Sequence, residues 1–288
     1  MRILVTGANG ILGRALAQRL GMGGHTLFLW GREEADLTHE DQVRAAAKGI
    51  EFDAIVHAAA MTDVDRCESE PDLAMDVNGR ATGIVATLAR ERGAMFVYVS
   101  TDYVFDGTKG TPYLEEDPTK PINAYGRSKH AGEKAAAASG ARCLITRTSW
   151  LFGEGGRNFV DTIAGKILQG APLQVVEDQR GSPTYARDLA HGIEVLLRRG
   201  ALGTVHVTNS GETTWYGFAV EIGRFLGASA AISPVPSEKF PRPAPRPHYS
   251  VLSGARYRAL AGETLRPWQE AVHHYLASRK PGGGGEAT

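Results

Sequence analysis

Tyr125 and Lys129 are the residues of this chain whose types and spacing most directly suggest chemistry. They precede a run of good helix formers, and residues four apart lie on one face of a helix, so the phenol and the ammonium can reach the same substrate. A neighbouring cation lowers the pKa of a tyrosine, which then exchanges a proton with a carbonyl oxygen more readily. The same spacing is common by chance on exposed helices, so the pair needs support from elsewhere in the chain.

The first twenty residues supply that support. An apolar run at 3–5 suits a buried parallel strand, glycines follow in the spacing G-x-x-G-x-x-G, and a helical run occupies 14–20. Such glycines allow a tight turn and let backbone N–H groups approach a pyrophosphate at a helix N-terminus. This order predicts a dinucleotide site. The contacts expected from it lie at Gly7, Gly10, Ile11, Leu12 and Gly13.

Further elements must hold these residues in place. Apolar runs that suit strands occur at 27–30, 53–56, 95–99, 141–148, 173–176 and 205–207. Helical patterns occur at 42–47, 76–92, 131–138, 160–168, 188–197, 215–226 and 268–276. Strands that alternate with helices in this way are typical of a parallel α/β sheet, whose ligands bind at the carboxyl edge.

Composition limits the function classes. The 288 residues carry 32 basic and 32 acidic side chains, which argues against a broad nucleic-acid surface. No apolar run approaches the length of a membrane span, and no signal-peptide pattern precedes the first strand. Cys67 and Cys143 have no metal-ligand spacing and are too few for a disulfide framework. We therefore expect a cytoplasmic protein with neither a nucleic-acid nor a membrane partner.

Together these features resemble the short-chain dehydrogenase/reductase superfamily, in its extended branch that acts on nucleotide sugars. The chain is most similar to the dTDP-4-dehydrorhamnose reductase family, over most of its length. The segments that carry the resemblance are 57–62, 100–107, 147–150, 178–184, 213–216 and 246–247. Several such segments in the family's order are far more specific than either motif alone.

The resemblance implies an α/β fold, with a Rossmann-type doubly wound parallel sheet and a smaller, partly interleaved C-terminal substrate lobe. The NAD(P)-binding domain would span 1–152, with later segments returning to it, and the sugar-nucleotide lobe would lie mainly in 153–280. The tail 281–288 contains four consecutive glycines and is expected to be disordered.

The end of the second strand decides between NADP and NAD. An acidic residue there would bind the ribose 2′-OH and repel a 2′-phosphate, whereas this chain has Gly31 and Arg32. A guanidinium suits a phosphate, so we expect NADPH to be preferred, with NADH also accepted. A solvated Arg32 is the alternative. By resemblance, Asp36 and Leu37 lie beside the adenine.

The third strand leads into small residues that the resemblance assigns to the cofactor, namely Ala60, Met61 and Thr62. Thr62 and Val64 also border the expected sugar site.

The charged residues that follow are interpreted as a solvated face rather than a metal site; they are Asp63, Asp65, Arg66, Glu68 and Glu70. His57 reads as a structural histidine. Some family members hold magnesium at a dimer contact, but Ala15 occupies the position that would supply a carboxylate, so we expect no such metal.

The fourth strand delivers the third catalytic group. The family's spacing points to Thr101, with Ser100 as a secondary candidate, and this hydroxyl would bond the same carbonyl oxygen as Tyr125. Other positions that match sugar contacts in the family are Asp102, Tyr103, Trp150, Gln179 and Arg246. A plain core role for Trp150, and a connector role for the Pro-rich segment around Arg246, are the alternatives.

The implied reaction is hydride transfer from NADPH to the C4 ketone of dTDP-4-dehydro-L-rhamnose, giving dTDP-L-rhamnose for cell-surface polysaccharide. Tyr125 would donate the proton, Lys129 would lower its pKa and hold the nicotinamide ribose, and Thr101 would orient the oxygen. A reductase or epimerase for another nucleotide sugar stays open. So does a non-catalytic NADP-binding subunit similar to the regulatory subunit of methionine adenosyltransferase. The sequence leaves a homodimer undecided.

Overall fold

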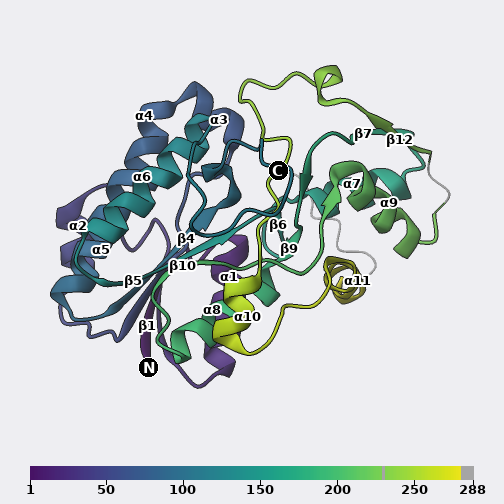
Figure 1. The fold of residues 1–288 in the computed structure, drawn as a ribbon. Coiled ribbons are helices and arrows are strands. Elements are labelled where there is room, and N and C mark those ends of the chain that lie inside the picture. Colours follow the sequence, from purple (N-terminus) through teal and green to yellow (C-terminus); the bar gives the residue numbers. More distant parts are fainter. Residues whose placement is uncertain (229–230, 280–288) are drawn as a thin grey trace.

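The computed structural model describes residues 1–228 and 231–279, and its centre is a parallel sheet. The sheet has the order β10-β5-β4-β3-β1-β2, with every neighbouring pair parallel (Figure 1). Its strands are β1 (Arg2–Thr6), β2 (Thr26–Trp30), β3 (Ala54–His57), β4 (Met95–Thr101), β5 (Arg142–Thr148) and β10 (Gly203–His206). The chain order reverses between β1 and β3, as in doubly wound folds, and the predicted Rossmann-type class is confirmed.

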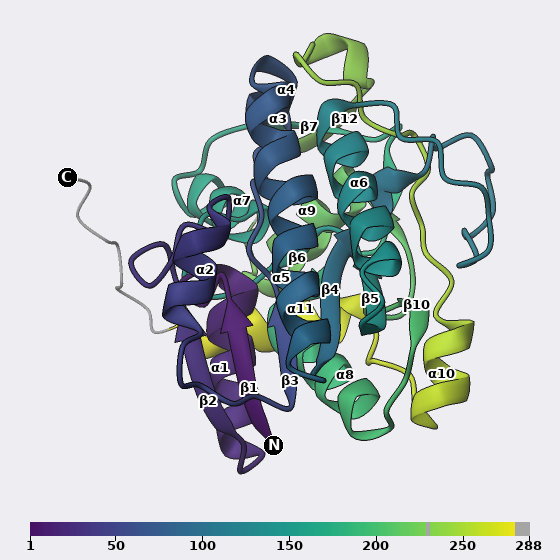
Figure 2. The same ribbon diagram turned by 90° about the vertical axis from the view of Figure 1, so that its left-hand side faces the viewer.

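Helices cover both faces of this sheet because its strands are apolar on both sides. Ile3 and Val5 of β1 pack toward one face, and Leu4 between them packs toward the other. The first face is covered by α1 (Ile11–Met22), α8 (Ala186–Arg198) and α10 (Ala255–Ala261). The second is covered by α2 (Glu40–Ala46), α5 (Ala81–Glu91) and α6 (Ala124–Ala138), and Figure 2 shows this layer from outside.

The helix expected at 76–92 begins earlier and is irregular. It is preceded by α3 (Val64–Ser69) and α4 (Pro71–Ala74), and its first turns form a π-helix, Met75–Arg80. Gly132 of α6 packs against this π-helix so closely that an added Cβ would lie 2.4 Å from the Asn78 carbonyl oxygen. Single-turn π-helices are frequent at functional sites, and this one presents Asn78 to the edge of the sheet.

A second core lies beside the large sheet. It is built from α7 (Phe159–Leu168), α9 (Trp215–Phe225), α11 (Trp268–Ser278) and the parallel pair β7 (Leu173–Val176) and β12 (Ile232–Val235). Four two-residue strands form two further pairs: β6 (Leu151–Phe152) with β9 (Thr184–Tyr185), and β8 (Arg180–Gly181) with β11 (Thr213–Thr214). Asn158 and Thr214 cap α7 and α9, as their positions before these helices predict. The sequence did not predict β12, which contains Pro234.

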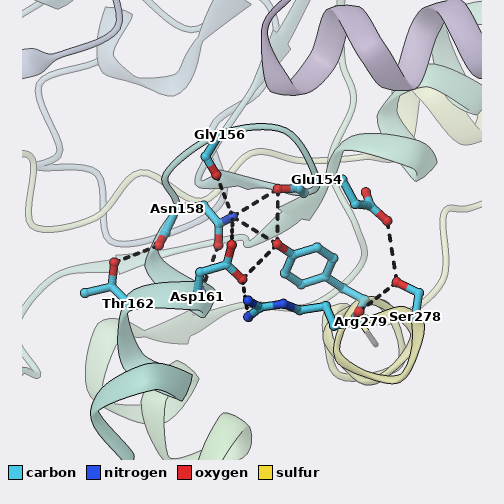
Figure 3. A network of polar contacts seen from close by, with 9 residues as sticks. Glu154, Gly156, Asn158, Asp161, Thr162, Ser278 and Arg279 are labelled. Carbon is cyan, nitrogen blue, oxygen red and sulfur yellow. Dashed lines mark hydrogen bonds and ion pairs between the residues drawn. The ribbon is translucent and has the colours of Figure 1, made fainter. Parts of the chain in front are cut away.

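A polar network ties α11 to the start of α7 (Figure 3). The Tyr275 hydroxyl donates to Asp161 at 2.8 Å, and Arg279 forms an ion pair with the same carboxylate at 2.6 Å. Asn158 donates to the Gly153 carbonyl at 3.0 Å, which fixes the loop that enters α7. The last described helix is therefore held to the middle of the chain by polar contacts as well as by packing.

The chain passes between the two cores more than once. After α7 and β7 in the smaller core, α8 and β10 return to the large sheet, and α9 then goes back. The expected disordered tail, 281–288, lies outside the described residues. Within the described residues, no helix has both the length and the apolar character needed to cross a membrane.

Candidate active site

Helix α6 positions the tyrosine and the lysine. It begins at Ala124, and the Asn123 side chain caps it by accepting from the Gly126 N–H at 2.8 Å. Tyr125, Lys129 and Glu133 follow at four-residue intervals and therefore lie along one side of the helix. Asn123 also donates to the Pro245 carbonyl at 2.8 Å, so the cap binds the Pro-rich segment to the catalytic helix.

Lys129 is buried and turned toward the sheet rather than toward the phenol. Its ammonium donates to the Val99 carbonyl at 2.6 Å and lies 4.2 Å from the centre of the Tyr98 ring. Burial lowers the pKa of Lys129 to about 7, although Glu133 acts to raise it. Burial also raises the pKa of Tyr125, with the Thr101 hydroxyl acting to lower it. The expected lowering of the Tyr125 pKa by Lys129 is therefore not found: burial raises this pKa, and the group that acts to lower it is Thr101 rather than Lys129.

Thr101 lies at the carboxyl end of β4, two residues before Tyr103, whose ring packs against the Tyr125 ring. The Thr101 hydroxyl donates to Asp102 Oδ1 at 2.9 Å and accepts from the Tyr103 N–H at 3.2 Å. The structure thus places Thr101 beside Tyr125 as expected. In this arrangement the one proton of the hydroxyl is directed at a neighbouring carboxyl.

Ser100, the secondary candidate, serves another purpose. Its hydroxyl donates to Glu133 at 2.6 Å, and Glu133 forms two hydrogen bonds of 2.8 Å with Arg147. All three side chains are buried. Burial acts to raise the pKa of Glu133, but its bonds to Arg147 prevail and lower it to about 2. Sequence reasoning missed this network, and the four-residue step from Lys129 to Glu133 was the available signal.

Asp102 does not face an open sugar site as expected. Only 2% of the residue is exposed, and Oδ2 has no hydrogen-bond donor in good geometry within the described part of the chain. Burial raises the pKa of this carboxyl to about 7, with Ser250 and Thr101 acting to lower it. The carboxyl is bonded to the Thr101 hydroxyl. Its neighbour Tyr103 is half-buried and packs edge-on against Tyr125, at 5.8 Å between ring centres.

The glycine turn before α1 fits a dinucleotide. Gly7 has φ of 70°, and a Cβ there would lie 2.6 Å from the Ala59 nitrogen. A Cβ on Gly13 would lie 2.1 Å from the Gly7 carbonyl oxygen. Gly10 caps α1 without a side-chain hydrogen bond from any described residue, so the first N–H groups of the helix are available to an anion. These features match what a pyrophosphate needs.

The Asn78 side chain holds the segment after β3 through hydrogen bonds to the backbone of Met61. The Asn78 side chain accepts from the Met61 N–H at 2.8 Å and donates to the Met61 carbonyl at 3.0 Å and to Ser128 at 2.9 Å. The contact with Ser128 links this segment to the catalytic helix. Thr62 is exposed beside it, while Ala60, Met61 and Val64 are half-buried. Sequence reasoning did not single out Asn78, since its role depends on the π-helix.

Comparison with known proteins agrees with this geometry. The family model of the RmlD substrate binding domain matches residues 1–280. The chain belongs to this family. A dTDP-4-dehydrorhamnose reductase of Burkholderia thailandensis is 41% identical over 289 residues, covering 94% of this chain and 97% of the relative. The expected resemblance to dTDP-4-dehydrorhamnose reductases is confirmed, and the protein is an NAD(P)-dependent oxidoreductase by family.

Two further relatives bear on cofactor and substrate. A crystal structure of dTDP-4-dehydrorhamnose reductase from Bacillus anthracis in complex with NADP has a TM-score of 0.93 and 36% identity, covering 96% of this chain and 99% of that one. A dTDP-4-keto-6-deoxy-D-glucose reductase of Streptomyces niveus is 39% identical and covers 94% of this chain and 95% of the relative. The family thus includes reductases of more than one nucleotide sugar.

The adenosine end of this RmlD-family protein carries charges of both signs. Arg32 is exposed at the end of β2, but Glu34 reaches the same turn and accepts from the Gly31 N–H at 2.6 Å. Glu34 therefore adds a carboxylate to the turn that carries Gly31 and Arg32. Asp36 is exposed and accepts from Thr38, while Leu37 is half-buried.

The charged segment of α3 is more ordered than the expected solvated face. Asp65 pairs with Arg246 at 2.6 Å and accepts from the Ala244 N–H at 3.2 Å, which brings the Pro-rich segment to the start of α3. Glu68 accepts from the Ala124 N–H at 2.7 Å, at the start of the catalytic helix. Arg246, which the resemblance places among the sugar contacts, is thus half-buried and bound to protein.

Trp150 lies in a strained and closely packed position. Its φ is 47°, unusual for a bulky residue, and its ring stacks on Trp215 with 3.5 Å between ring centres. A Cβ on Gly181 would lie 2.5 Å from the Trp150 ring, so only glycine fits behind it. Trp150 is half-buried, as is Gln179 in the turn between β7 and β8. Backbone strain of this kind is often retained at functional sites.

Two remaining expectations concern His57 and metals. His57 is fully buried and bonds Thr6 at 2.7 Å and Thr82 at 3.2 Å, and burial lowers its pKa to about 3. It therefore stays neutral and structural near pH 7. Ala15 belongs to the buried side of α1 and packs in the core. Among residues 1–228 and 231–279, no cluster of His, Cys, Asp or Glu has the composition of a metal site.

Proposed function

We propose that the protein is an NADPH-dependent reductase that converts dTDP-4-dehydro-L-rhamnose to dTDP-L-rhamnose, a precursor of cell-surface polysaccharide. The observation that carries the proposal is the position of Tyr125 beside the carboxyl end of β4, where its ring packs against Tyr103 and the Tyr103 N–H bonds the Thr101 hydroxyl. This edge is where parallel α/β sheets bind their ligands. Family membership over residues 1–280 supports the same activity.

The nicotinamide cofactor supplies the hydride when it is bound. The glycine turn at 7–13 binds the diphosphate through backbone N–H groups, and Lys129 binds the nicotinamide ribose. Tyr125 gives its phenolic proton to the oxygen at C4, and Thr101 bonds the same oxygen and orients it. The remaining predicted cofactor contacts are Arg32, Asp36, Leu37, Ala60, Met61 and Thr62.

The sugar nucleotide is proposed to lie between the two cores of the chain, with the cofactor on the 1–152 side and the lobe of 153–280 around the substrate. Tyr103, Trp150, Gln179 and Arg246 are retained as proposed contacts, together with Thr62, Val64 and Thr101. Asp102 is not retained, since its carboxyl is covered. The reaction is proposed to take place in the cytoplasm.

The direct test follows NADPH oxidation at the nicotinamide absorbance with dTDP-4-dehydro-L-rhamnose as substrate. Turnover is expected, together with formation of dTDP-L-rhamnose. A protein that binds NADPH and yet leaves this substrate unchanged would contradict the proposal. The same assay with NADH measures the cofactor preference.

A reductase of a related nucleotide sugar is the second candidate. The relative from Streptomyces niveus, named for a different 4-keto-6-deoxy sugar, is nearly as similar as the rhamnose enzymes. Parallel assays with dTDP-4-keto-6-deoxy-D-glucose distinguish the two candidates by their kcat/KM values. An epimerase would consume no NADPH, and a non-catalytic subunit would bind NADP without turnover of either sugar.

A further inference from the structure

The Thr101 hydroxyl has one proton and two lone pairs, and their use depends on its neighbours. One lone pair accepts from the Tyr103 N–H, and the proton is directed at Asp102 Oδ1 at 2.9 Å. An ionised Asp102 offers no proton, so this bond consumes the only proton of Thr101. Thr101 then meets Tyr125 as an acceptor and draws the phenolic proton away from a substrate oxygen.

A protonated Asp102 reverses these roles. Its carboxyl O–H donates to Thr101, so that both lone pairs of Thr101 accept, one from Asp102 and one from the Tyr103 N–H. The Thr101 proton is then released to the side where Tyr125 lies. A carbonyl oxygen placed there receives two donors, the phenol and the hydroxyl, as reduction to an alcohol requires.

The surroundings of Asp102 favour the protonated form. The residue is 2% exposed, and no described cation forms an ion pair with it. Arg246, which acts on the pKa of the adjacent Tyr103, is paired with Asp65, and the Lys129 ammonium bonds the Val99 carbonyl. The other titratable or polar groups around the carboxyl are Tyr103 on its own turn, Tyr125 from α6 and Ser250 from the segment after β12.

We propose that Asp102 sets the direction of the Thr101 hydrogen bond, and that only its carboxylic acid form lets Thr101 donate to the substrate oxygen. The inference rests on the proposed reductase function. Asp102 acts through Thr101 and is a positioning residue. Its pKa, raised to about 7 by burial, places the change of state near neutral pH. Activity should therefore fall as pH rises above this value.

The first test is the pH profile of kcat/KM for the wild-type chain and Asp102→Asn. The wild type should lose about tenfold per pH unit on the alkaline side. The asparagine N–H₂ group donates to Thr101 at every pH, so the variant should remain active and lack this decline. Asp106→Asn is the matched control on the same segment; its carboxylate has a lowered pKa, because bonds from Thr108 outweigh burial, and the wild-type decline should persist.

A decline that persists unchanged in Asp102→Asn would belong to another group such as Lys129 and would overturn the inference. A variant that binds NADPH but is inactive at every pH would overturn it as well. Ser250→Ala gives an independent check. Since the Ser250 hydroxyl favours the ionised carboxyl, its removal should move the decline to higher pH. An unmoved decline in this variant would also count against the inference.

The protonation state can also be read without turnover. In cofactor-free protein labelled with ¹³C at aspartate carboxyls, one resonance should titrate near pH 7 and be absent from Asp102→Asn. Titration of every aspartate below about pH 5 would overturn the inference. Failure of the wild type to reduce the sugar would instead refute the proposed function and leave this measurement valid.

Discussion

Two buried carboxyls lie near the end of β4, one bonded to Ser100 and the other to Thr101. Successive strand residues point to opposite faces, so Ser100 reaches Glu133 and Thr101 reaches Asp102. Glu133 is bound by Arg147 and has its pKa lowered to about 2 in spite of burial. Asp102 has no described cation partner, and burial raises its pKa to about 7. Equal burial thus gives opposite charge states, and the presence of a guanidinium decides which one.

The difference separates a structural side of the strand from a chemical side. On the Glu133 side, the carboxylate is paired with Arg147 and accepts from Ser100. On the Asp102 side, one carboxyl oxygen lacks a donor in good geometry among the described residues, and Thr101 and Tyr125 are the residues proposed to contact the substrate. Substitutions on the two sides should therefore affect different properties.

The largest effect is expected on the structural side. Arg147→Met leaves the Glu133 carboxylate buried without its cation, and loss of one partner of a buried pair costs about 3–5 kcal/mol. Urea unfolding followed by circular dichroism measures this. The double variant Arg147→Met/Glu133→Gln should recover part of the loss. A single variant within about 0.5 kcal/mol of wild type, the usual range of a surface change, would break the comparison.

The two neighbouring hydroxyls should separate activity from stability. Thr101→Val removes a donor to the developing oxyanion and should lower kcat by about 10²–10³-fold. Ser100→Ala should keep near-wild-type kcat. Its free energy of unfolding should fall by about 1 kcal/mol, because the substitution removes one buried hydrogen bond. Turnover and urea unfolding of both variants provide the check. A larger loss of kcat in Ser100→Ala would reverse the assignment of the two sides.

The two carboxyls should also give opposite pH dependences of stability. Glu133 has a lowered pKa, so its contribution is present above pH 4.5 and is lost as pH falls toward about 2. Asp102 has a raised pKa, so its contribution is present below pH 3.8 and is lost as pH rises through about 7. Each is on the order of 1 kcal/mol per pKa unit. The free energy of unfolding, measured across this pH range, should lose the acid-side dependence in Glu133→Gln and the neutral-side dependence in Asp102→Asn. Curves that match the wild type would contradict the assignment of these dependences to the two carboxyls.

An exposed guanidinium should matter less than the buried Arg147. Arg32→Ala should lower the ratio of NADPH to NADH turnover by about 3–10-fold, because an exposed charge interaction contributes about 1 kcal/mol. Glu34→Gln should change the ratio in the opposite direction, since it removes a carboxylate from the same turn. Steady-state rates with both cofactors measure this. An unchanged ratio in Arg32→Ala would mean that the guanidinium does not contact the cofactor.

The large sheet was predictable because its signals are local. Apolar runs such as 95–99 identify buried strands, the glycines at 7, 10 and 13 identify the turn before α1, and Asn158 and Thr214 identify helix starts. Tyr125 and Lys129 were also found locally, as a four-residue spacing on one helix. Each of these features depends on residues that are close in the sequence.

The features that were missed depend on tertiary contacts. The pair of Asp65 and Arg246 joins residues 181 positions apart, and no local pattern indicates it. The role of Asn78 depends on a π-helix that forms against Gly132 of another helix. The direction of the Thr101 proton depends on the burial of Asp102, which the sequence does not reveal. The types of the catalytic residues were therefore predictable, but their protonation and hydrogen bonding were not.

The central claim is that Tyr125, on the Thr101 side of β4, gives the proton to the reduced carbonyl. Its most direct test is single-turnover NADPH oxidation by Tyr125→Phe with dTDP-4-dehydro-L-rhamnose, beside NADPH binding by the same variant. A loss of about a hundredfold or more in rate, with unchanged NADPH affinity, is predicted. A rate close to that of the wild type would contradict the assignment of Tyr125 as the proton donor.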